Sequence, residues 1–307
     1  MKYPGKLNKG DTVGIICPST NIDEERKQKC IETLTNMGYN VKVADNLTEN
    51  YGGYMAGDGR VRAKWINDMF ADTEVKAIFC VRGGYAGSRA MEFVDFDLIK
   101  NNPKIFVGYS DVTSFHLGIT QNCDFVTFHG PMVSSNMVDK FDEETAESFF
   151  NAINADNAYE FKNTTGKAIE VLKEGEAEGQ LIGGNLALLS ACIGTPYEID
   201  TKGKILFIEE IEETMSRIER FIYQLRASGK LAECAGIILG QFTDCTNPNM
   251  PEYTELDLFK DVLEGIDIPV LYNVQSGHDF PMMTLPFGAV CKIDTKTKTI
   301  KFAKPER

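Results

Sequence analysis

The sequence predicts an α/β protein of two domains: an N-terminal domain with a parallel sheet and a nucleophile-elbow-like turn, and a C-terminal α/β domain with a mixed sheet. Apolar runs alternate with helical segments, which is typical of parallel strands joined by right-handed crossovers. A chain of 307 residues is too long for one small hydrophobic core, which favours two domains. A polar stretch rich in Asn, Glu and Lys separates the halves, so we predict domains at 1–150 and 179–307 and a linker at 151–178.

In the first half, short apolar runs predict buried strands at 12–17, 41–43, 76–81 and from Ile105 onward. Helical periodicity predicts helices at 23–37 and 60–70. Within the second helix Val61, Trp65 and Met69 recur every fourth residue on one face, and we expect Trp65 in the core.

In the second half, a glycine-rich turn at 179–186 is expected to lead into an apolar helix. The helix at 215–225 is amphipathic, with Ser216 and Glu219 in capping-box spacing. Strands are expected at 204–208, 236–240, 268–274, 289–293 and 299–302, the last two forming a hairpin.

The amino-acid composition limits the kinds of partner that this protein can bind. The net charge of −13 argues against nucleic acid and against anionic membrane surfaces. The first residues lack the apolar segment of a secretory signal, and no run approaches the length of a membrane span, so we expect a cytoplasmic protein without a membrane partner. The eight cysteines are scattered without metal-ligand spacing, which predicts reduced, buried thiols and no metal site.

The run from Ile105 ends in Gly108-Tyr109-Ser110-Asp111 and continues as a helix. Hydrolases expose their nucleophilic serine on a corner of this kind, between a strand and a helix. The N-terminus of the following helix offers free N–H groups to an oxyanion. Val112 replaces the glycine of the usual elbow signature, so the turn is a variant. The alternative is that Ser110 caps the helix.

A second turn, Arg82-Gly83-Gly84, also follows a predicted strand. Carboxyl ends of parallel strands share one edge of the sheet, so this turn and Ser110 can lie on one rim. The glycines would let backbone N–H groups approach a substrate; a simple turn or a phosphate cradle are the alternatives. The loop from Gly52 to Gly59 is glycine-rich, and its composition suggests a lid.

A serine nucleophile needs a base, and the chain has three histidines. We expect His116, inside the helix after Ser110, to be structural. His129 sits at a strand end and is a second candidate. His278 follows a strand in a Gly-His-Asp loop and is the best candidate base.

The acid that orients the base should also lie at a strand end. Glu209 is the first polar residue after four apolar ones and is the preferred acid. Asp279 competes, although a sequence neighbour seldom points its side chain at the imidazole. The remaining glutamates of the cluster, Glu210, Glu212 and Glu213, are expected on a solvated face or as a cap for the next helix.

Together these motifs resemble the LD-carboxypeptidase family of serine peptidases, which includes murein tetrapeptide carboxypeptidases and microcin C immunity peptidases. Ala86 stands where that family often has glycine. The motifs run in order over nearly the whole chain: Arg-Gly-Gly-Tyr at 82–85, Gly-Tyr-Ser-Asp-Val-Thr at 108–113, Phe-His-Gly-Pro-Met at 128–132, Gly-Gly-Asn-Leu at 183–186, Phe-Ile-Glu at 207–209 and Gly-His at 277–278.

The resemblance implies a catalytic triad of Ser110, Glu209 and His278, and an oxyanion hole formed by the backbone N–H groups of Gly84 and Asp111. It implies hydrolysis, through an acyl-enzyme, of the amide between an L-centre diamino acid and a terminal D-Ala in cytoplasmic muropeptides, a step of murein recycling. No metal or cofactor is needed, and a homodimer is expected.

Arg82 and Tyr85 are the predicted substrate-binding residues. Arg82 is a candidate to bind the substrate's free carboxylate; the alternative is that Arg82 makes only a structural ion pair. Within the family, the alternative is an immunity-type peptidase or amidase that cleaves aminoacyl- or peptidyl-nucleotide toxins. From another class, a non-catalytic two-domain ligand-binding protein would use Ser110 only as a helix cap. Against this last reading, a serine, an acid and a histidine each stand at a strand end.

Overall fold

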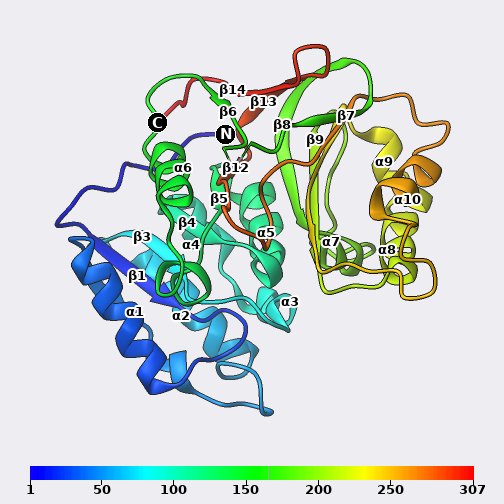
Figure 1. Ribbon diagram of the computed structural model, residues 1–307. Coiled ribbons are helices and arrows are strands. Elements are labelled where there is room, and N and C mark those ends of the chain that lie inside the picture. Colours follow the sequence, from blue (N-terminus) through cyan, green and yellow to red (C-terminus); the bar gives the residue numbers. More distant parts are fainter. Residues whose placement is uncertain (165) are drawn as a thin grey trace. The chain divides into compact units, whose positions relative to one another are not determined.

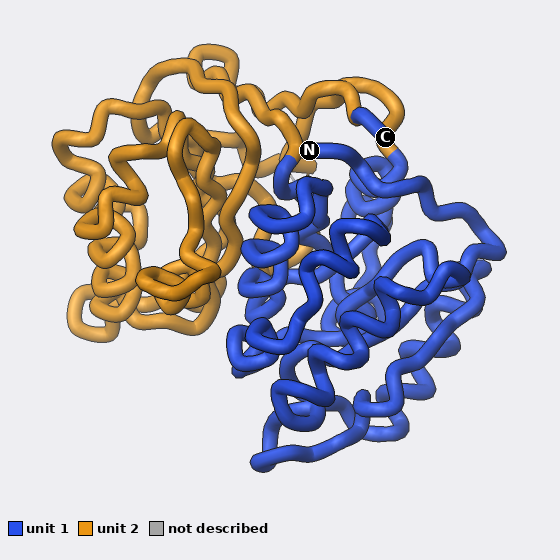
Figure 2. The backbone as a smooth tube through the Cα atoms, turned by 180° about the vertical axis from the view of Figure 1, so that it is seen from behind, with its two compact units in different colours: residues 1–154, 284–288, 306–307 blue, residues 155–283, 289–305 orange. Residues whose placement is uncertain are grey.

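Two sheets organise the chain, each in its own unit. Figure 2 shows the two units in different colours. The computed structural model describes residues 1–164 and 166–307. The first unit comprises 1–154, 284–288 and 306–307, and the second comprises 155–283 and 289–305. The predicted fold class, α/β with a mostly parallel N-terminal sheet and a mixed C-terminal sheet, is confirmed.

The sheet of the first unit has the strand order β12-β5-β4-β3-β1-β2, and all its pairs are parallel except β12 with β5 (Figure 1). Its strands are β1 (Thr12–Ile16), β2 (Asn40–Val43), β3 (Val75–Cys80), β4 (Ile105–Gly108), β5 (Thr127–His129) and β12 (Leu285–Phe287). Its α-helices are α1 (Glu24–Asn36), α2 (Gly59–Ala71), α3 (Gly87–Ala90), α4 (Phe96–Asn101), α5 (Thr113–Cys123) and α6 (Glu143–Ile153). Shorter turns of helix are η1 (Asp45–Thr48), η2 (Met91–Phe93), η3 (Ser110–Val112) and η4 (Val133–Met137).

Helices cover both faces of this sheet. Phe70 on α2 stacks on Phe106 of β4, with ring centroids 6.0 Å apart. Phe149 on α6 meets Phe79 of β3 edge-to-face at 5.5 Å. Phe106 pairs with Ile78, one residue before Phe79, so the two phenylalanines on adjacent strands point to opposite faces. The result is a helix–sheet–helix sandwich with the core on both sides of the strands.

The predicted face of α2 is only partly right: Met69 is fully buried as expected, but the other two residues are not. Trp65 is only half-buried, with Lys64 over its ring, and Val61 is likewise half-buried. The fully buried stripe instead includes Arg62 and Ile66. A charged residue occupies the core face, so the apolar periodicity pointed to the neighbouring stripe.

The sheet of the second unit has the order β6-β14-β13-β8-β9-β10-β11-β7, with parallel pairs from β8 to β11 and antiparallel pairs elsewhere. Its strands are β6 (Tyr159–Phe161), β7 (Glu170–Lys173), β8 (Glu176–Asn185), β9 (Ile205–Ile211), β10 (Gly236–Thr243), β11 (Val270–Tyr272), β13 (Val290–Asp294) and β14 (Thr299–Phe302). Its helices are α7 (Leu186–Ala191), α8 (Met215–Ala227), α9 (Lys230–Glu233) and α10 (Glu255–Val262). Helices α8, α9 and α10 lie together on one side of the β8–β11 portion (Figure 1).

Two expectations for this unit are corrected. The segment read as a glycine-rich turn is the end of the long strand β8, where a Cβ on Gly183 would run into the Phe207 backbone of β9. Glycine there allows the two parallel strands to approach rather than the chain to turn. Helix α8 begins after Thr214, which places Ser216 inside the first turn rather than at the cap. The predicted hairpin is confirmed as β13 and β14.

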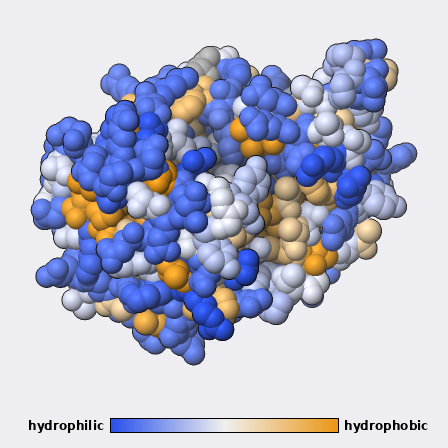
Figure 3. All heavy atoms as spheres, turned by 90° about the horizontal axis from the view of Figure 1, so that it is seen from below, coloured by the Kyte–Doolittle hydropathy of each residue, from blue (hydrophilic) through white to orange (hydrophobic). Residues whose placement is uncertain are grey.

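The stretch predicted as a linker, 151–178, contains the end of α6, strands β6 and β7, and the start of β8. On the face shown in Figure 3, hydrophobic groups are scattered among hydrophilic side chains. Within the described residues, no helix is both long and apolar enough to cross a membrane.

Candidate active site

Ser110 lies where β4 gives way to helix in the first unit. Its φ is +64°, a strained value for a residue with a side chain. The short turn η3 begins at Ser110, its N-cap is Tyr109, and the N-cap of α5 is Val112. Ser110 therefore does not cap either helix. A half-buried serine on a strained strand-to-helix corner matches the predicted elbow geometry.

The buried side chain of His116 on α5 holds the end of β4, just before this corner. Its Nε2–H donates to the Gly108 carbonyl at 2.8 Å, while Nδ1 lies 2.8 Å from Thr127 Oγ1 on β5. Burial lowers the pKa of His116 to about 4, so the ring is neutral near pH 7. The imidazole thus joins the end of β4 to β5.

The loop after β3 closes against the same corner. A Cβ built on Gly83 would lie 2.9 Å from Ser110 Cβ and 3.1 Å from Ser110 Oγ, so the two turns are in contact. Gly84 has φ +121°, and a Cβ there would meet Thr20 of the loop after β1. Ala86 has φ +68°, which explains why glycine suits this position.

Arg82 and Tyr85 flank these glycines and are both exposed. Arg82 lines a polar groove of about 730 Å³ in the first unit, together with Asn21, Asn50 and Ser135. No hydrogen bond or ion pair involves the Arg82 guanidinium in residues 1–164 and 166–307. Tyr85 is 71% exposed and meets Tyr54 of the glycine-rich loop edge-to-face. Both side chains are accessible to a ligand.

Glu209 and His278 lie together in the second unit. Glu209, on β9, is fully buried, and its Oε2 lies 2.6 Å from His278 Nδ1 in the loop after β11. This contact leaves Nε2 as the ring nitrogen that could exchange a proton with substrate or nucleophile. A carboxylate bound to Nδ1 fixes both the orientation and the tautomer of the ring.

The charge around His278 favours its protonated form. Burial opposes the charge, but Glu209, with smaller contributions from Glu210 and Glu212, outweighs this effect and raises the pKa of His278. The base is therefore stronger than a free imidazole.

Glu210 was expected on a solvated face or as a cap for the next helix, and the structure corrects both, because its carboxyl is buried and its helical partner lies in the preceding helix α7. It is 2% exposed, and its carboxyl accepts hydrogen bonds from Asn185 Nδ2 at 2.6 Å and from the Ala187 N–H at 2.8 Å. Burial raises its pKa to about 7. The sequence marked Glu209 as fixed at the strand end, but it gave no signal that Glu210 also turns inward.

The two competing residues, Asp279 and His129, make other contacts. Asp279 is exposed and accepts from the N–H of Phe280, while its own N–H donates to Gln241. His129 is fully buried at the end of β5, between the rings of Tyr109 and Phe287.

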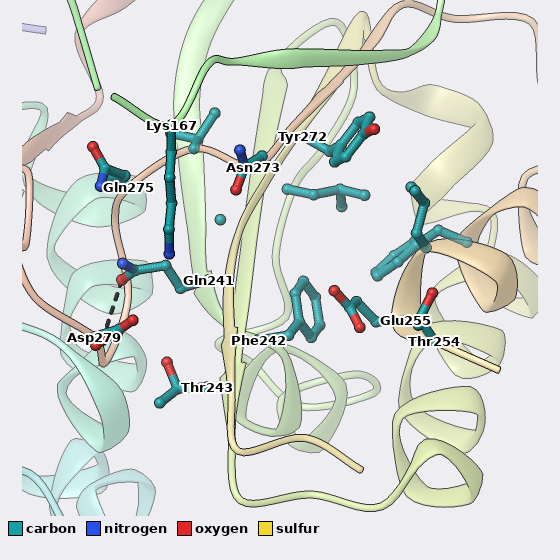
Figure 4. A pocket seen from close by; sticks show the side chains of 15 residues that line it. Lys167, Gln241, Phe242, Thr243, Thr254, Glu255, Tyr272, Asn273, Gln275 and Asp279 are labelled. Carbon is teal, nitrogen blue, oxygen red and sulfur yellow. Dashed lines mark hydrogen bonds between the residues drawn. The ribbon is translucent and has the colours of Figure 1, made fainter. Parts of the chain in front are cut away.

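A pocket of about 320 Å³ lies in the second unit beside the loop that carries His278. In Figure 4, Lys167, Gln241 and Asp279 lie on one side of it, and Phe242 and Glu255 lie on the other. Neither Glu209 nor His278 lines it. The pocket is therefore a neighbour of the acid–histidine pair rather than part of it.

The fold thus presents a strained serine beside glycine-rich backbone in one α/β unit, and a carboxylate-oriented imidazole in the other. These are the groups of a hydrolase. Comparison with known proteins agrees: residues 13–130 match the LD-carboxypeptidase N-terminal domain, and residues 178–293 match the LD-carboxypeptidase C-terminal domain. The chain belongs to the LD-carboxypeptidase family and is a carboxypeptidase.

Relatives extend along the whole chain. A probable murein peptide carboxypeptidase of Bacillus subtilis is 37% identical over 96% of this chain and 92% of its own. The structure of a muramoyltetrapeptide carboxypeptidase from Oxalobacter formigenes superposes with a TM-score of 0.83, at 26% identity, covering 96% and 100% of the two chains. The microcin C7 self-immunity protein MccF, solved in complex with aspartyl sulfamoyl adenosine, gives a TM-score of 0.90, also at 26% identity, covering 99% and 98%.

Proposed function

We propose that this protein is a serine-type LD-carboxypeptidase that removes the terminal D-Ala from muropeptide tetrapeptides by cleaving its amide bond to an L-centre diamino acid. The observation that carries the proposal is the 2.6 Å contact between Glu209 and His278, combined with the strained Ser110 corner. The likeness to the Bacillus subtilis murein peptide carboxypeptidase supports the substrate.

In the proposed reaction His278 Nε2 takes the proton of Ser110 Oγ as the oxygen attacks the carbonyl carbon of the scissile amide. The N–H groups of Gly84 and Asp111 stabilise the oxyanion. The tetrahedral intermediate then collapses, and His278 passes its proton to the departing amine of D-Ala. Water, deprotonated by His278, hydrolyses the acyl-enzyme and regenerates Ser110. Glu209 stabilises the imidazolium of His278 both when the acyl-enzyme forms and when it is hydrolysed.

A carboxypeptidase must recognise a free terminal carboxylate, and we assign that role to Arg82. Its guanidinium is exposed at the edge of the loop that carries Gly83 and Gly84 and is not engaged by any described residue. A planar guanidinium binds a carboxylate through two parallel hydrogen bonds. We assign Tyr85 to contact with the adjoining part of the peptide.

The proposal includes a cytoplasmic location and a homodimer. All eight cysteines are free thiols, which suits a reducing compartment. The homodimer follows from the family resemblance, and the domain division at 1–150 and 179–307 with a linker between is retained as part of the proposal.

A second candidate is an immunity-type peptidase or amidase acting on aminoacyl- or peptidyl-nucleotides. The close structural likeness to MccF favours it. The higher sequence identity to the murein peptide carboxypeptidase, 37% against 28% for the Escherichia coli MccF sequence, favours the muropeptide.

The deciding experiment incubates wild-type and Ser110→Ala protein with a purified murein tetrapeptide and follows D-Ala release by mass spectrometry. Release is expected from the wild type and not from the variant. Ser114→Ala, four residues further on and inside α5, is the matched control and should retain activity. If the wild type releases no D-Ala but cleaves an aminoacyl sulfamoyl adenosine, the second candidate replaces the first.

A further inference from the structure

Arg62 is a charged side chain that is fully enclosed within the first unit. It is 0% exposed and lies on the core face of α2. Burying a guanidinium is costly unless its donors are satisfied. Here the compensation comes from backbone carbonyls: Nη1 donates to Pro18 at 2.9 Å and to Ala86 at 2.8 Å, and Nε donates to Gly57 at 3.2 Å.

These three carbonyls belong to three different loops. Pro18 follows β1, Gly57 belongs to the glycine-rich loop, and Ala86 belongs to the loop after β3 that carries Gly84. A single guanidinium therefore joins three loops, of which the loop after β3 contacts Ser110 and the loop after β1 contacts Gly84. An arginine can do this because its planar fork presents several fixed donors.

The peptide unit between Ala86 and Gly87 is held from both sides. Its carbonyl accepts from Arg62, and its N–H donates to Asp111 Oδ2 at 2.7 Å. Asp111 directly follows Ser110, and its carboxyl is buried. The two contacts orient this peptide while Ala86 keeps its positive φ.

We infer that Arg62 is a positioning residue for the oxyanion hole: the Arg62 guanidinium, the Ala86–Gly87 peptide and the Asp111 carboxylate form a clamp that sets the Gly84 N–H against the Asp111 N–H. The inference rests on the proposed function, in which those two N–H groups bind the oxyanion. Because the clamp acts on the transition state, losing it lowers kcat and leaves KM nearly unchanged.

The test compares Arg62→Met and Arg62→Lys with Lys104→Met. Lys104 is a matched control, because its ammonium is also buried and donates to backbone carbonyls, those of Met69 and Asp72, near the far end of the same helix. The assay measures kcat and KM for D-Ala release from murein tetrapeptide, and urea unfolding measures stability.

Arg62→Met is expected to lower kcat about 10²-fold, the usual effect of misplacing a catalytic group by about 1 Å. Arg62→Lys should fall between this variant and the wild type, because an ammonium is a point charge without the fork. Lys104→Met should lose stability while keeping kcat. If Arg62→Met does not fold, Arg62→Lys decides the matter. Wild-type kcat in a folded Arg62 variant, or an equal loss of kcat in Lys104→Met, overturns the inference.

Failure of the proposed function can be distinguished from failure of this inference, because in the first case the wild type itself releases no D-Ala. In that case the same variants are compared by the rate at which an alkyl fluorophosphonate modifies Ser110, followed by intact mass. That reaction also places negative charge in the oxyanion hole. Slower modification of Arg62→Met than of Lys104→Met supports the clamp, and equal rates refute it.

Discussion

Gly84→Ala probes the proposed oxyanion hole through a clash that can be measured. The new Cβ would lie 2.6 Å from Thr20 Cβ and closer still to Thr20 Oγ1, whereas ordinary contact begins near 3.4 Å. Even when the Thr20 hydroxyl rotates away, the contact with Thr20 Cβ requires the loops to separate by about 0.8 Å, the difference between 3.4 and 2.6 Å. Removing one oxyanion donor costs about 10²–10³ in kcat, and a 1 Å misplacement costs about 10². We expect kcat for D-Ala release to fall about 10²-fold, with KM within about threefold.

Two companion variants separate the clash from backbone strain. Gly10→Ala introduces a Cβ at a similarly positive φ of +89° but into open space, so it should keep wild-type kcat. Thr20→Gly combined with Gly84→Ala removes both clashing atoms and leaves the Thr20 nitrogen at 3.5 Å, an ordinary contact. The double variant should therefore regain much of the lost activity. A folded Gly84→Ala enzyme with undiminished kcat would show that the Gly84 N–H is not an oxyanion donor.

Two further predictions concern protonation. The reaction needs a neutral His278, and its pKa is raised, so kcat/KM should fall with decreasing pH through an apparent pKa above the ordinary 6.5. Glu212→Gln removes a charge that favours protonation and should move this limb to lower pH; an unchanged or higher limb in a pH–rate profile would contradict the assignment. His116→Phe removes the donor to the Gly108 carbonyl and should lower the free energy of unfolding at pH 7 by about 1–3 kcal/mol, measured by urea denaturation. Because the pKa of His116 is about 4 in the folded protein, its contribution to the free energy of unfolding is fully present above pH 6.5 and is lost as the pH falls towards 4. The difference in the free energy of unfolding between wild type and variant should therefore shrink at pH 4.5. A difference that stays constant with pH would refute a neutral buried ring.

The sequence was most informative where local pattern and tertiary role coincide. The strands β1, β3 and β4 are short apolar runs that end in glycine- or serine-rich turns, so both the parallel sheet and the Ser110 corner could be predicted. The first helix was equally clear from its periodicity, and α1 begins one residue after the predicted start, with Asp23 as the N-cap that accepts from the Arg26 N–H.

It was least informative where a charged or glycine residue has a buried role. Both Arg62 and Glu210 lie inside the protein. Arg62 is held by backbone carbonyls of distant loops, and Glu210 is held by Asn185 and by the N–H of Ala187 in α7, so no local pattern marks these partners. Gly183 looks like a turn residue, although it serves the close approach of two strands. Strand β12 is three residues long and pairs with a strand more than 150 positions earlier, which periodicity cannot show.

That pairing has a consequence for how the protein is made. Leu285 pairs with His129 at the edge of the first unit's sheet, so β5 keeps an open edge until the chain has grown past residue 287. At the usual synthesis rate of about 5–20 residues per second, that edge is unpaired for roughly 8–30 s on the ribosome. An open, apolar strand edge invites pairing with other chains. A fragment ending at residue 154 would keep this exposure permanently, so the first unit is best produced only as part of the whole chain.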